Sequence, residues 1–454
     1  MTFTKFILII FTSIIICQRE KLQIVNIGNP NFKPEETQNL VFAFNHMTSG
    51  ASSPCYGLNN IYTDIFDQKW DGYCELTKKG FLQLFKLGKI YQQRYYRLLN
   101  LSNPDIYKVR SFASQANKTL MSSNALFYGM FINKDTPIDE QLTVPVNNFK
   151  SYNQSELIPI FYYTERSHCK GWDKIVENNM NKKANEINGR LGGFFKRYRD
   201  VFNLLKNDER MIKSKTLYEK VNLFCSSYIS NYSDDRCPKI PIFKKLKYTP
   251  AQLYNLYYDC IEINLYRHVG VEYGWEGRKV PMIVLSELVE DMLKYMDDII
   301  KNPDSPKYVS YIGHDSTMAA LQIILEKAFN VPPKMMNYAS NQVFLLYKLD
   351  ENDNNVEKNY NVKYFFNDQL SMVNTYDEFK KGLLDVMKTE KNLEYFCGGL
   401  KSYDYVVLLL CSGIIFLFFS IVSICCYHRN DIFNKKVYMS LKEEPKEKSV
   451  EIKN

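Results

Sequence analysis

Several kinds of functional signal are missing from this chain of 454 residues. Its formal net charge is +8, but Lys and Arg form no run, so we expect no nucleic-acid partner. The cysteines form no CxxC pair, which argues against a zinc site, and the acidic segment 350–358 lacks the ligand spacing of a cation-binding loop. We therefore expect neither a metal ion nor another cofactor. No internal repeat is present.

Long hydrophobic runs are also rare, and the two that occur lie near the ends of the chain. Lys5 is followed by the apolar segment 6–17, which has the basic start and the length of a signal peptide and is too short to cross a bilayer comfortably. Residues 405–427 contain no charge over 23 positions and lack the polar stripe of a buried core helix. At ~1.5 Å per residue, this second segment is long enough to span a membrane.

These two segments predict a single-pass type I membrane protein. Cleavage of a signal peptide at 1–17 and insertion of a transmembrane helix at 405–427 place the body of the chain in an endolysosomal lumen or outside the cell. Residues 428–454 then form a cytoplasmic tail. Arg429 and Lys435 lie close to the span in that tail, as the positive-inside bias requires.

The predicted tail contains one candidate sorting signal. Tyr438 and Leu441 bracket the tetrapeptide YMSL, which fits the Y-x-x-Φ pattern that clathrin adaptors bind as an extended peptide. It lies eleven residues beyond the predicted span, although such tetrapeptides are common by chance. Clathrin adaptors are therefore expected partners, in addition to the membrane itself.

Seven cysteines lie between the predicted signal peptide and the predicted span, and in an oxidising compartment they favour disulfides. The odd number leaves one thiol free or bonded to another chain. The sequence leaves open the pairing of Cys55, Cys74, Cys225, Cys237 and Cys260. Sequons for N-glycosylation, which suit the same compartment, occur at Asn100, Asn117, Asn153 and Asn231.

Apolar strand-like segments alternate with helical ones over most of the chain. Strands are expected at 40–44, 106–109, 157–163, 308–312 and 342–347, with helices from Thr77 towards Leu99 and at 118–131, 283–300 and 316–328. This alternation predicts an α/β domain, residues 23–169 and 251–397, with a mostly parallel sheet flanked by helices. Residues 170–250 have helical spacing and no clear strand signal, which predicts an inserted helical cap.

Four segments of the α/β region resemble motifs of the histidine acid phosphatase family (branch 2 of the histidine phosphatase superfamily). Segment 72–88, GYCELTKKGFLQLFKLG, is similar to the family's G-F-G-x-L-T-x-x-G-x-x-Q-x-x-x-L-G, with Cys74 in place of a glycine. Segment 119–123, TLMSS, resembles T-L-M-S-A, and IGHDSTMAAL at 312–321 resembles the family's H-D-T-T motif. NYAS follows at 337–340. The resemblance covers residues 40–397 and implies a histidine phosphatase fold.

The resemblance also implies a mechanism. In the family, a histidine at the end of a strand, within R-H-G-x-R-x-P, attacks phosphorus and forms a phosphohistidine. The flanking arginines hold the phosphoryl oxygens. By this resemblance His314 donates to phosphate and Asp315 protonates the leaving alcohol, which requires a proton on the carboxyl group. Cys169 and Cys397 occupy the positions of a long-range disulfide in the family.

The first catalytic motif is degenerate in this chain. Aligned without a gap on Gly50 and Pro54, the family's nucleophilic histidine corresponds to Ser49, and its two arginines correspond to Thr48 and Ser52. An alternative alignment with three inserted residues makes His46 the nucleophile, but Asn and Met then replace its Arg and Gly neighbours.

The arginine that the family supplies from its second strand also has two alternative positions in this chain. A two-residue bulge keeps Arg110 in place, whereas a gapless register puts Phe112 there and Lys118 at the later arginine position. Arg110 and Lys118 are therefore both candidate phosphate-binding residues.

The sequence thus predicts a membrane-anchored family member with the layout of lysosomal acid phosphatases and little or no activity. Loss of a nucleophile costs about 10³ to 10⁶ in rate, so we interpret the chain as a pseudophosphatase that keeps a pocket for phosphate or a phosphoester around His314. The alternative is an active lumenal acid phosphatase that hydrolyses phosphate monoesters. A third hypothesis is a structural protein whose pocket has decayed.

Overall fold

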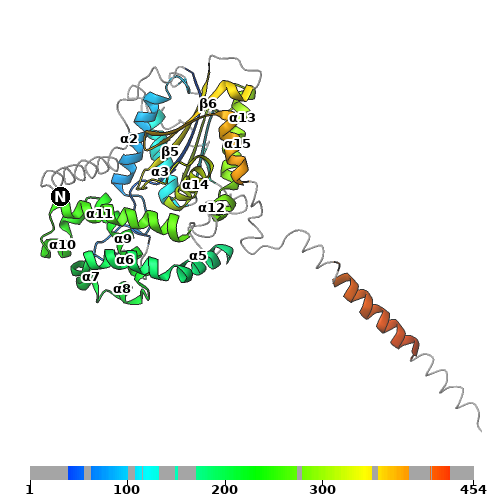
Figure 1. The fold of residues 1–454 in the computed structure, drawn as a ribbon, viewed down its shortest axis with the longest axis horizontal. Coiled ribbons are helices and arrows are strands. Elements are labelled where there is room, and N and C mark those ends of the chain that lie inside the picture. Colours follow the sequence, from blue (N-terminus) through cyan, green and yellow to red (C-terminus); the bar gives the residue numbers. More distant parts are fainter. Residues whose placement is uncertain are drawn as a thin grey trace, which may run out of the picture. The chain divides into compact units, whose positions relative to one another are not determined.

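The computed structural model describes the following residues: 39–55, 63–100, 108–114, 116–131, 149–151, 170–272, 279–349, 356–387, 410 and 412–429 (Figure 1). Contacts divide the chain into two units, residues 1–393 and 394–454, which are described separately. Some predicted features lie outside the described residues: the signal peptide, the strand at 157–163, Asn153, Cys169, Cys397, Tyr438 and Leu441.

The first unit is built on a seven-stranded sheet in the order β3-β2-β4-β1-β5-β6-β7. The strands are β1 (Leu40–Thr48), β2 (Val109–Ala113), β3 (Phe149–Ser151), β4 (Tyr308–Gly313), β5 (Asn341–Lys348), β6 (Tyr360–Phe366) and β7 (Gln369–Thr375). The predicted α/β fold class is confirmed. The sheet is mixed: β3, β2, β4 and β1 are parallel, whereas β5, β6 and β7 pair antiparallel.

A tight hairpin joins the last two strands of the antiparallel half of the sheet. Only Asn367 and Asp368 separate β6 from β7, and both have positive φ angles, 45° and 62°, as tight hairpin turns require. The acidic segment 350–358 falls between β5 and β6. Parallel pairs require longer crossovers, which the chain makes with helices in its first half.

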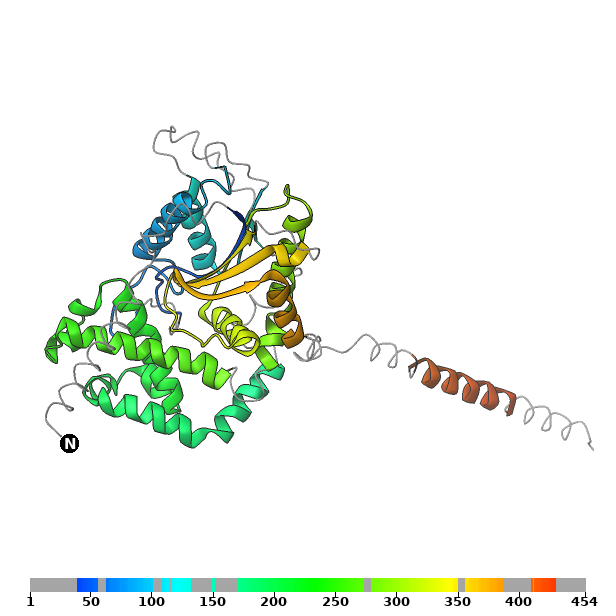
Figure 2. The same cartoon turned by 45° about the horizontal axis from the view of Figure 1, so that its top comes forward.

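Helices cover both faces of the sheet, as Figures 1 and 2 show. One face packs against α2 (Lys78–Arg94) and α3 (Asn117–Phe131). The other face packs against α13 (Ser286–Lys301), α14 (Asp315–Phe329) and α15 (Tyr376–Met387), with α12 (Lys279–Val284) beside them. Helix α2 begins where the sequence predicts, because the Thr77 hydroxyl accepts the Gly80 N–H and caps the first turn.

A group of helices with its own hydrophobic core lies at one end of the sheet, shown in green in Figure 2. It contains α5 (Lys170–Lys182), α6 (Ala184–Arg197), α7 (Arg199–Leu205), α8 (Glu209–Lys213), α9 (Leu217–Ser233), α10 (Pro241–Lys245) and α11 (Pro250–Leu265). Helix α11 continues into a π-helical turn, Tyr266–Glu272. These helices and the π-helical turn, residues 170–272, form what is called the helical region below. It extends beyond residue 250, the predicted end of the cap.

Two strands differ from the sequence expectation because buried polar groups find partners. Strand β1 continues past Phe44 because the Asn45 side chain donates to the Tyr308 hydroxyl and His46 contacts Gln342. Strand β2 begins at Val109, so the predicted strand at 106–109 is displaced. It runs through Ser111, whose hydroxyl lies 3.0 Å from that of Ser310 on β4.

The described part of the second unit is mostly one helix. Residues Ser412–Arg429 are long and apolar enough to cross a membrane, judged by length and composition. They overlap the predicted span at 405–427.

Candidate active site at the ends of β1 and β4

The register of two parallel strands brings two predicted site residues together. Thr48, the last residue of β1, pairs with Gly313, the last residue of β4. Ser49 and His314 therefore follow directly after the carboxyl ends of neighbouring strands, the edge at which α/β sheets place their ligands. His46 pairs with Tyr311, further back along the same strands.

The loop after β1 is fixed against the start of α2. A β-carbon added to Gly50 would lie 2.3 Å from the Gly80 carbonyl oxygen, so only glycine fits there. The Gly50 N–H donates to the Ser122 hydroxyl at 3.1 Å, and the Ala51 N–H donates to Gln83 Oε1 at 2.9 Å. These contacts fix the backbone of the loop and thereby hold Ser49 at the carboxyl edge of the sheet.

A cavity of about 1180 Å³ opens at this edge, between the strand ends and the helical region. Five of the predicted site residues line it: Thr48, Ser49, Lys118, His314 and Asp315. The helical region contributes a further set of polar residues, which includes Arg210, Lys213, Asn222, Asn264, Arg267, His268 and Glu272. Polar groups from both parts of the first unit therefore converge on one space.

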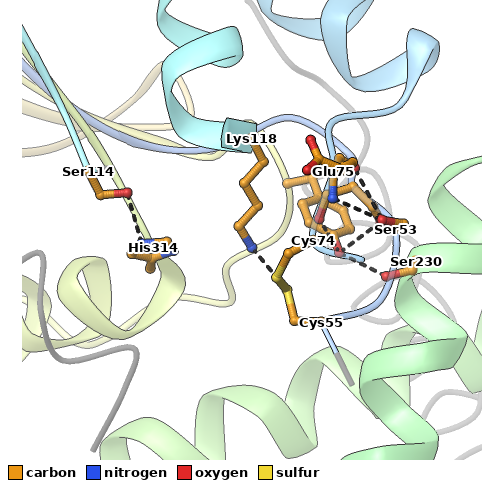
Figure 3. Close-up of a disulfide and its surroundings, with 10 residues drawn as sticks. Ser53, Cys55, Cys74, Glu75, Ser114, Lys118, Ser230 and His314 are labelled. Atoms are coloured by element: carbon orange, nitrogen blue, oxygen red, sulfur yellow. Dashed lines mark hydrogen bonds between the residues drawn. A yellow bond between two sulfur atoms is a disulfide. The ribbon is translucent and has the colours of Figure 1, made fainter. Parts of the chain in front are cut away.

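His314 is held as a neutral imidazole. It caps the N-terminus of α14, and its Nε2 lies 3.0 Å from the Ser114 hydroxyl, as Figure 3 shows. Ser114 in turn lies 2.6 Å from the hydroxyl of Thr119 on α3. Burial and the neighbouring Lys118 charge lower the pKa of His314 to about 3. A neutral His314 offers one N–H group to a ligand, but no charge.

Lys118 brings a cationic group to the cavity from the first turn of α3. Its side chain points toward the disulfide between Cys55 and Cys74, and its Nζ lies 3.5 Å from Cys55 Sγ (Figure 3). Burial lowers the pKa of Lys118, and the Asp315 carboxylate opposes part of that change. The disulfide settles the pairing of two cysteines, whereas Cys225, Cys237 and Cys260 are buried and unbridged.

Asp315 is held by the helical region. Its Oδ2 accepts a hydrogen bond from Asn264 Nδ2 at 2.8 Å and lies 3.2 Å from His268 Nε2. Burial raises the pKa of Asp315, but His268, Arg267 and Asn264 outweigh burial and hold the pKa well below its usual range. The carboxyl group is therefore ionised, which does not suit a group that must deliver a proton to a leaving alcohol.

The sequence reasoning missed the residues that surround Asp315. His268 Nδ1 lies 2.6 Å from Glu272 Oε2, four residues later on the π-helical turn. The i, i+4 spacing of this pair was a signal that it shared one helix face. Its position beside Asp315 depends on how the helical region packs against α14, which the sequence pattern does not contain.

Three other predicted site residues lie off the cavity wall. His46 is buried on the α14 face of the sheet, where its two ring nitrogens lie 3.3 Å from Gln342 Oε1 and from Thr317 Oγ1. Arg110 is the second residue of β2, opposite Val309, with its guanidinium donating to the Val109 carbonyl.

Ser52 and Phe112, the alternative arginine position, are both buried in the packed interior. The Ser52 hydroxyl contacts the Tyr338 hydroxyl at 3.3 Å, and its residue is fully buried. Phe112 stacks on Tyr311 with ring centroids 4.6 Å apart. Within the described ranges, no group of three or more His, Cys, Asp or Glu side chains could hold a metal ion.

The described sequons differ in exposure. Asn100 and Asn117 are exposed. Asn231 is fully buried, and its amide donates to Asp64 and to the Ser227 carbonyl. This burial leaves no room for a glycan, so the expectation of glycosylation at Asn231 is not compatible with the fold.

Comparison with known proteins identifies the family. The profile of the histidine phosphatase superfamily (branch 2) matches residues 33–367. A lysosomal acid phosphatase of Xenopus laevis is 28% identical over 318 residues, covering 68% of this chain and 66% of the relative, just under two thirds of its length. Putative acid phosphatase 5 of Caenorhabditis elegans is 25% identical over 361 residues, 76% of each protein.

Solved structures agree at the level of the fold. The phytase of Citrobacter braakii superposes with a TM-score of 0.52 at 12% identity, covering 77% of this chain and 98% of the phytase. A multiple inositol polyphosphate phosphatase of Bifidobacterium longum, in complex with inositol hexasulfate, gives 0.51 at 10% identity, with 74% and 88% covered. The family profile spans most of the chain, which therefore belongs to branch 2 of the histidine phosphatase superfamily.

Proposed function

We propose that this chain is a membrane-anchored histidine acid phosphatase relative that binds a phosphate monoester and turns it over weakly or not at all. One observation carries the proposal: the strand-end position beside His314 is occupied by Ser49. An alcohol is a poor nucleophile without a base, and His314 is engaged with Ser114. The cavity itself supports binding, because it combines Lys118 and His314 with donors from the helical region.

Two further features argue against efficient turnover. Thr48 and Ser52, at the arginine positions, supply no charge, and the Thr48 hydroxyl donates instead to the Asn337 carbonyl at 2.8 Å. Each charge-assisted hydrogen bond lost to phosphate costs about 1.5–3 kcal/mol. The ionised Asp315 lacks the proton that a leaving alcohol needs. Binding therefore survives more readily than catalysis.

The alternative is an active lumenal acid phosphatase. The names of the relatives favour it, since both sequence relatives are described as acid phosphatases. Activity would require either Ser49 as the nucleophile or movement of His46 out of its buried contacts with Gln342 and Thr317.

The proposed topology is that of a type I membrane protein. The proposed order begins with a signal peptide at 1–17 and an α/β domain at 23–169 and 251–397, which contains a helical cap at 170–250. A span at 405–427 and a tail at 428–454 follow. The apolar helix Ser412–Arg429 supports the span, and the disulfide supports a lumenal or extracellular location for the first unit. Recognition of Tyr438 and Leu441 by clathrin adaptors completes the proposal.

The test combines turnover with binding. The full chain, purified in detergent, is assayed on an aryl phosphate across acidic and neutral pH, alongside Ser49→Ala, His46→Ala and Asp315→Asn. Binding of inorganic phosphate is measured by calorimetry on the same samples. We expect phosphate binding and at most a trace of turnover that no variant removes. Robust turnover that is lost in Ser49→Ala or in His46→Ala would establish the alternative.

A further inference from the structure

The end of β1 contributes no cationic side chain to the cavity, whereas the helical region does. Strand β1 ends at Thr48 and is followed by Ser49, at the positions where the family has arginine and histidine. Arg267 and His268 belong to the π-helical turn of the helical region, and both line the cavity. A π-helical turn inserts one residue per turn into a helix and is frequent at functional sites.

The geometry of His268 makes its protonation state matter. Nδ1 lies 2.6 Å from Glu272 Oε2, whereas Nε2 lies 3.2 Å from Asp315 Oδ2 and 2.7 Å from Arg267 Nη2. A charged imidazole donates from both nitrogens, so it bridges the two carboxylates. A neutral imidazole that donates to Glu272 has only a lone pair at Nε2, which accepts from Arg267 instead. Arg267 therefore donates to His268 only when the imidazole is neutral.

We propose that Arg267 and His268 form the anion-binding arm of this cavity and take the place of the arginines that β1 lacks. The inference rests on the proposed function and names the residues that recognise its ligand, a tetrahedral oxyanion such as a phosphate group. With His268 charged, its Nε2–H turns to Asp315, and Arg267 Nη2 exchanges the imidazole for a ligand oxygen. Guanidinium groups suit this role because their planar donors match oxyanion geometry.

The charges around His268 come from two elements of the fold. Arg267 and Glu272 belong to its own turn, and Asp315 belongs to α14. Helix α5 contributes an uncharged contact, the Asn179 amide donating to the Val271 carbonyl. Protonated His268 and Arg267 together balance the two carboxylates. Loss of the His268 proton leaves this group with one net negative charge, which opposes an anion.

Anion affinity should therefore fall as His268 loses its proton. Burial and Arg267 lower the pKa of His268, but Glu272 and Asp315 outweigh them and raise it above its ordinary value. Sulfate is the probe of choice, because phosphate changes its own charge near neutral pH whereas sulfate does not. Calorimetry on the full chain in detergent should show sulfate binding at least ~10-fold tighter near pH 5 than near pH 8.

Matched variants locate the effect. Arg267→Gln should weaken sulfate binding at least ~10-fold near pH 5. The control is Arg197→Gln, which removes an exposed guanidinium paired with Asp259 on the outer surface of the same helical region and should leave affinity unchanged. His268→Gln should bind weakly at every pH and lose the pH dependence, because an amide does not titrate.

The outcomes separate this inference from the proposed function. Sulfate affinity that is the same near pH 5 and pH 8 in the wild type, or unaffected by Arg267→Gln, would overturn the inference and leave the proposed function standing. Sulfate binding that disappears only in Lys118→Gln would place the anion on α3 instead. This outcome would also overturn the inference and leave the proposed function standing. A folded wild-type chain that binds neither sulfate nor phosphate at any pH would overturn both.

Discussion

Asp315 Oδ2 lies 3.2 Å from His268 Nε2, so a carboxylate at the start of α14 contacts the helical region directly. Asn264 strengthens the same contact with a hydrogen bond of 2.8 Å. In the family to which this chain belongs, the equivalent carboxyl acts as an acid. Here the two neighbours make it an anchor between the two parts of the first unit.

Replacement of Asp315 by Asn should lower the pKa of His268, because one of the two carboxylates that stabilise the imidazolium is lost. NMR titration of the imidazole C–H signals measures this directly, with Asp259→Asn as the control, because Asp259 does not line the cavity and pairs with Arg197. An unchanged His268 pKa in Asp315→Asn would show that the two side chains are not coupled in solution.

The raised pKa of His268 also has a consequence for stability. Its contribution is complete below the unfolded value of about 6.5 and is lost as the pH rises through the folded value. Denaturant unfolding should therefore show a loss of stability on going from mildly acidic to alkaline pH that is smaller in His268→Gln. Identical slopes in the two proteins would contradict the expectation.

His46 predicts the opposite pH dependence. Burial lowers its pKa to about 4, with a partial offset from its contact with Gln342. The neutral form is favoured in the folded state, so stability is lost as the pH falls from about 6.5 towards 4, by about 3 kcal/mol at most. His46→Gln should be less sensitive to acid over this range in urea unfolding. Equal acid sensitivity would mean that His46 titrates normally.

Restoring a nucleophile tests the interpretation of Ser49. Because Ser49 lines the cavity beside His314, Ser49→His should raise aryl phosphate turnover at least ~10-fold above the wild type. Ser49→Ala serves as the control and should leave turnover at the wild-type level. No gain in a folded Ser49→His protein that still binds phosphate would show that the missing arginines limit the reaction more than the nucleophile does.

The buried pair of Arg94 and Asp368 should dominate the stability of the sheet edge. Nη1 lies 2.6 Å from Oδ1, and both side chains are at most 3% exposed. Removal of one partner leaves a buried charge, so Arg94→Met or Asp368→Asn should each cost about 3–5 kcal/mol. The double variant should cost clearly less than the sum of the single changes in a double-mutant cycle. Additive losses would show that the two charges do not interact.

Glycan mapping by mass spectrometry should find Asn231 unmodified. Its amide is buried against Asp64, whereas Asn100 and Asn117 are accessible to modification. A glycan at Asn231 would contradict the packing of α9 described above.

Much of the fold was predictable because its signals are local. Thr77 caps α2, and the apolar runs that became β4 and β5 have the composition of buried strands. The extension of β1 and the position of β2 were not predictable in this way. They depend on Asn45 and Ser111 finding buried partners far away in the sequence, and a local pattern cannot show whether such a partner exists.

The sequence by itself determined the family and the α/β class, because short motifs and local patterns carry both. It also predicts Ser49 at the position of the family's nucleophilic histidine, with His46 as the alternative. Only the tertiary structure decided what surrounds that position. It removed His46 and Arg110 from the cavity by strand register and brought His268 to Asp315 by packing the helical region against α14. Electrostatic partners are set by distance in space, and residues 47 positions apart in the chain become neighbours only when the fold closes.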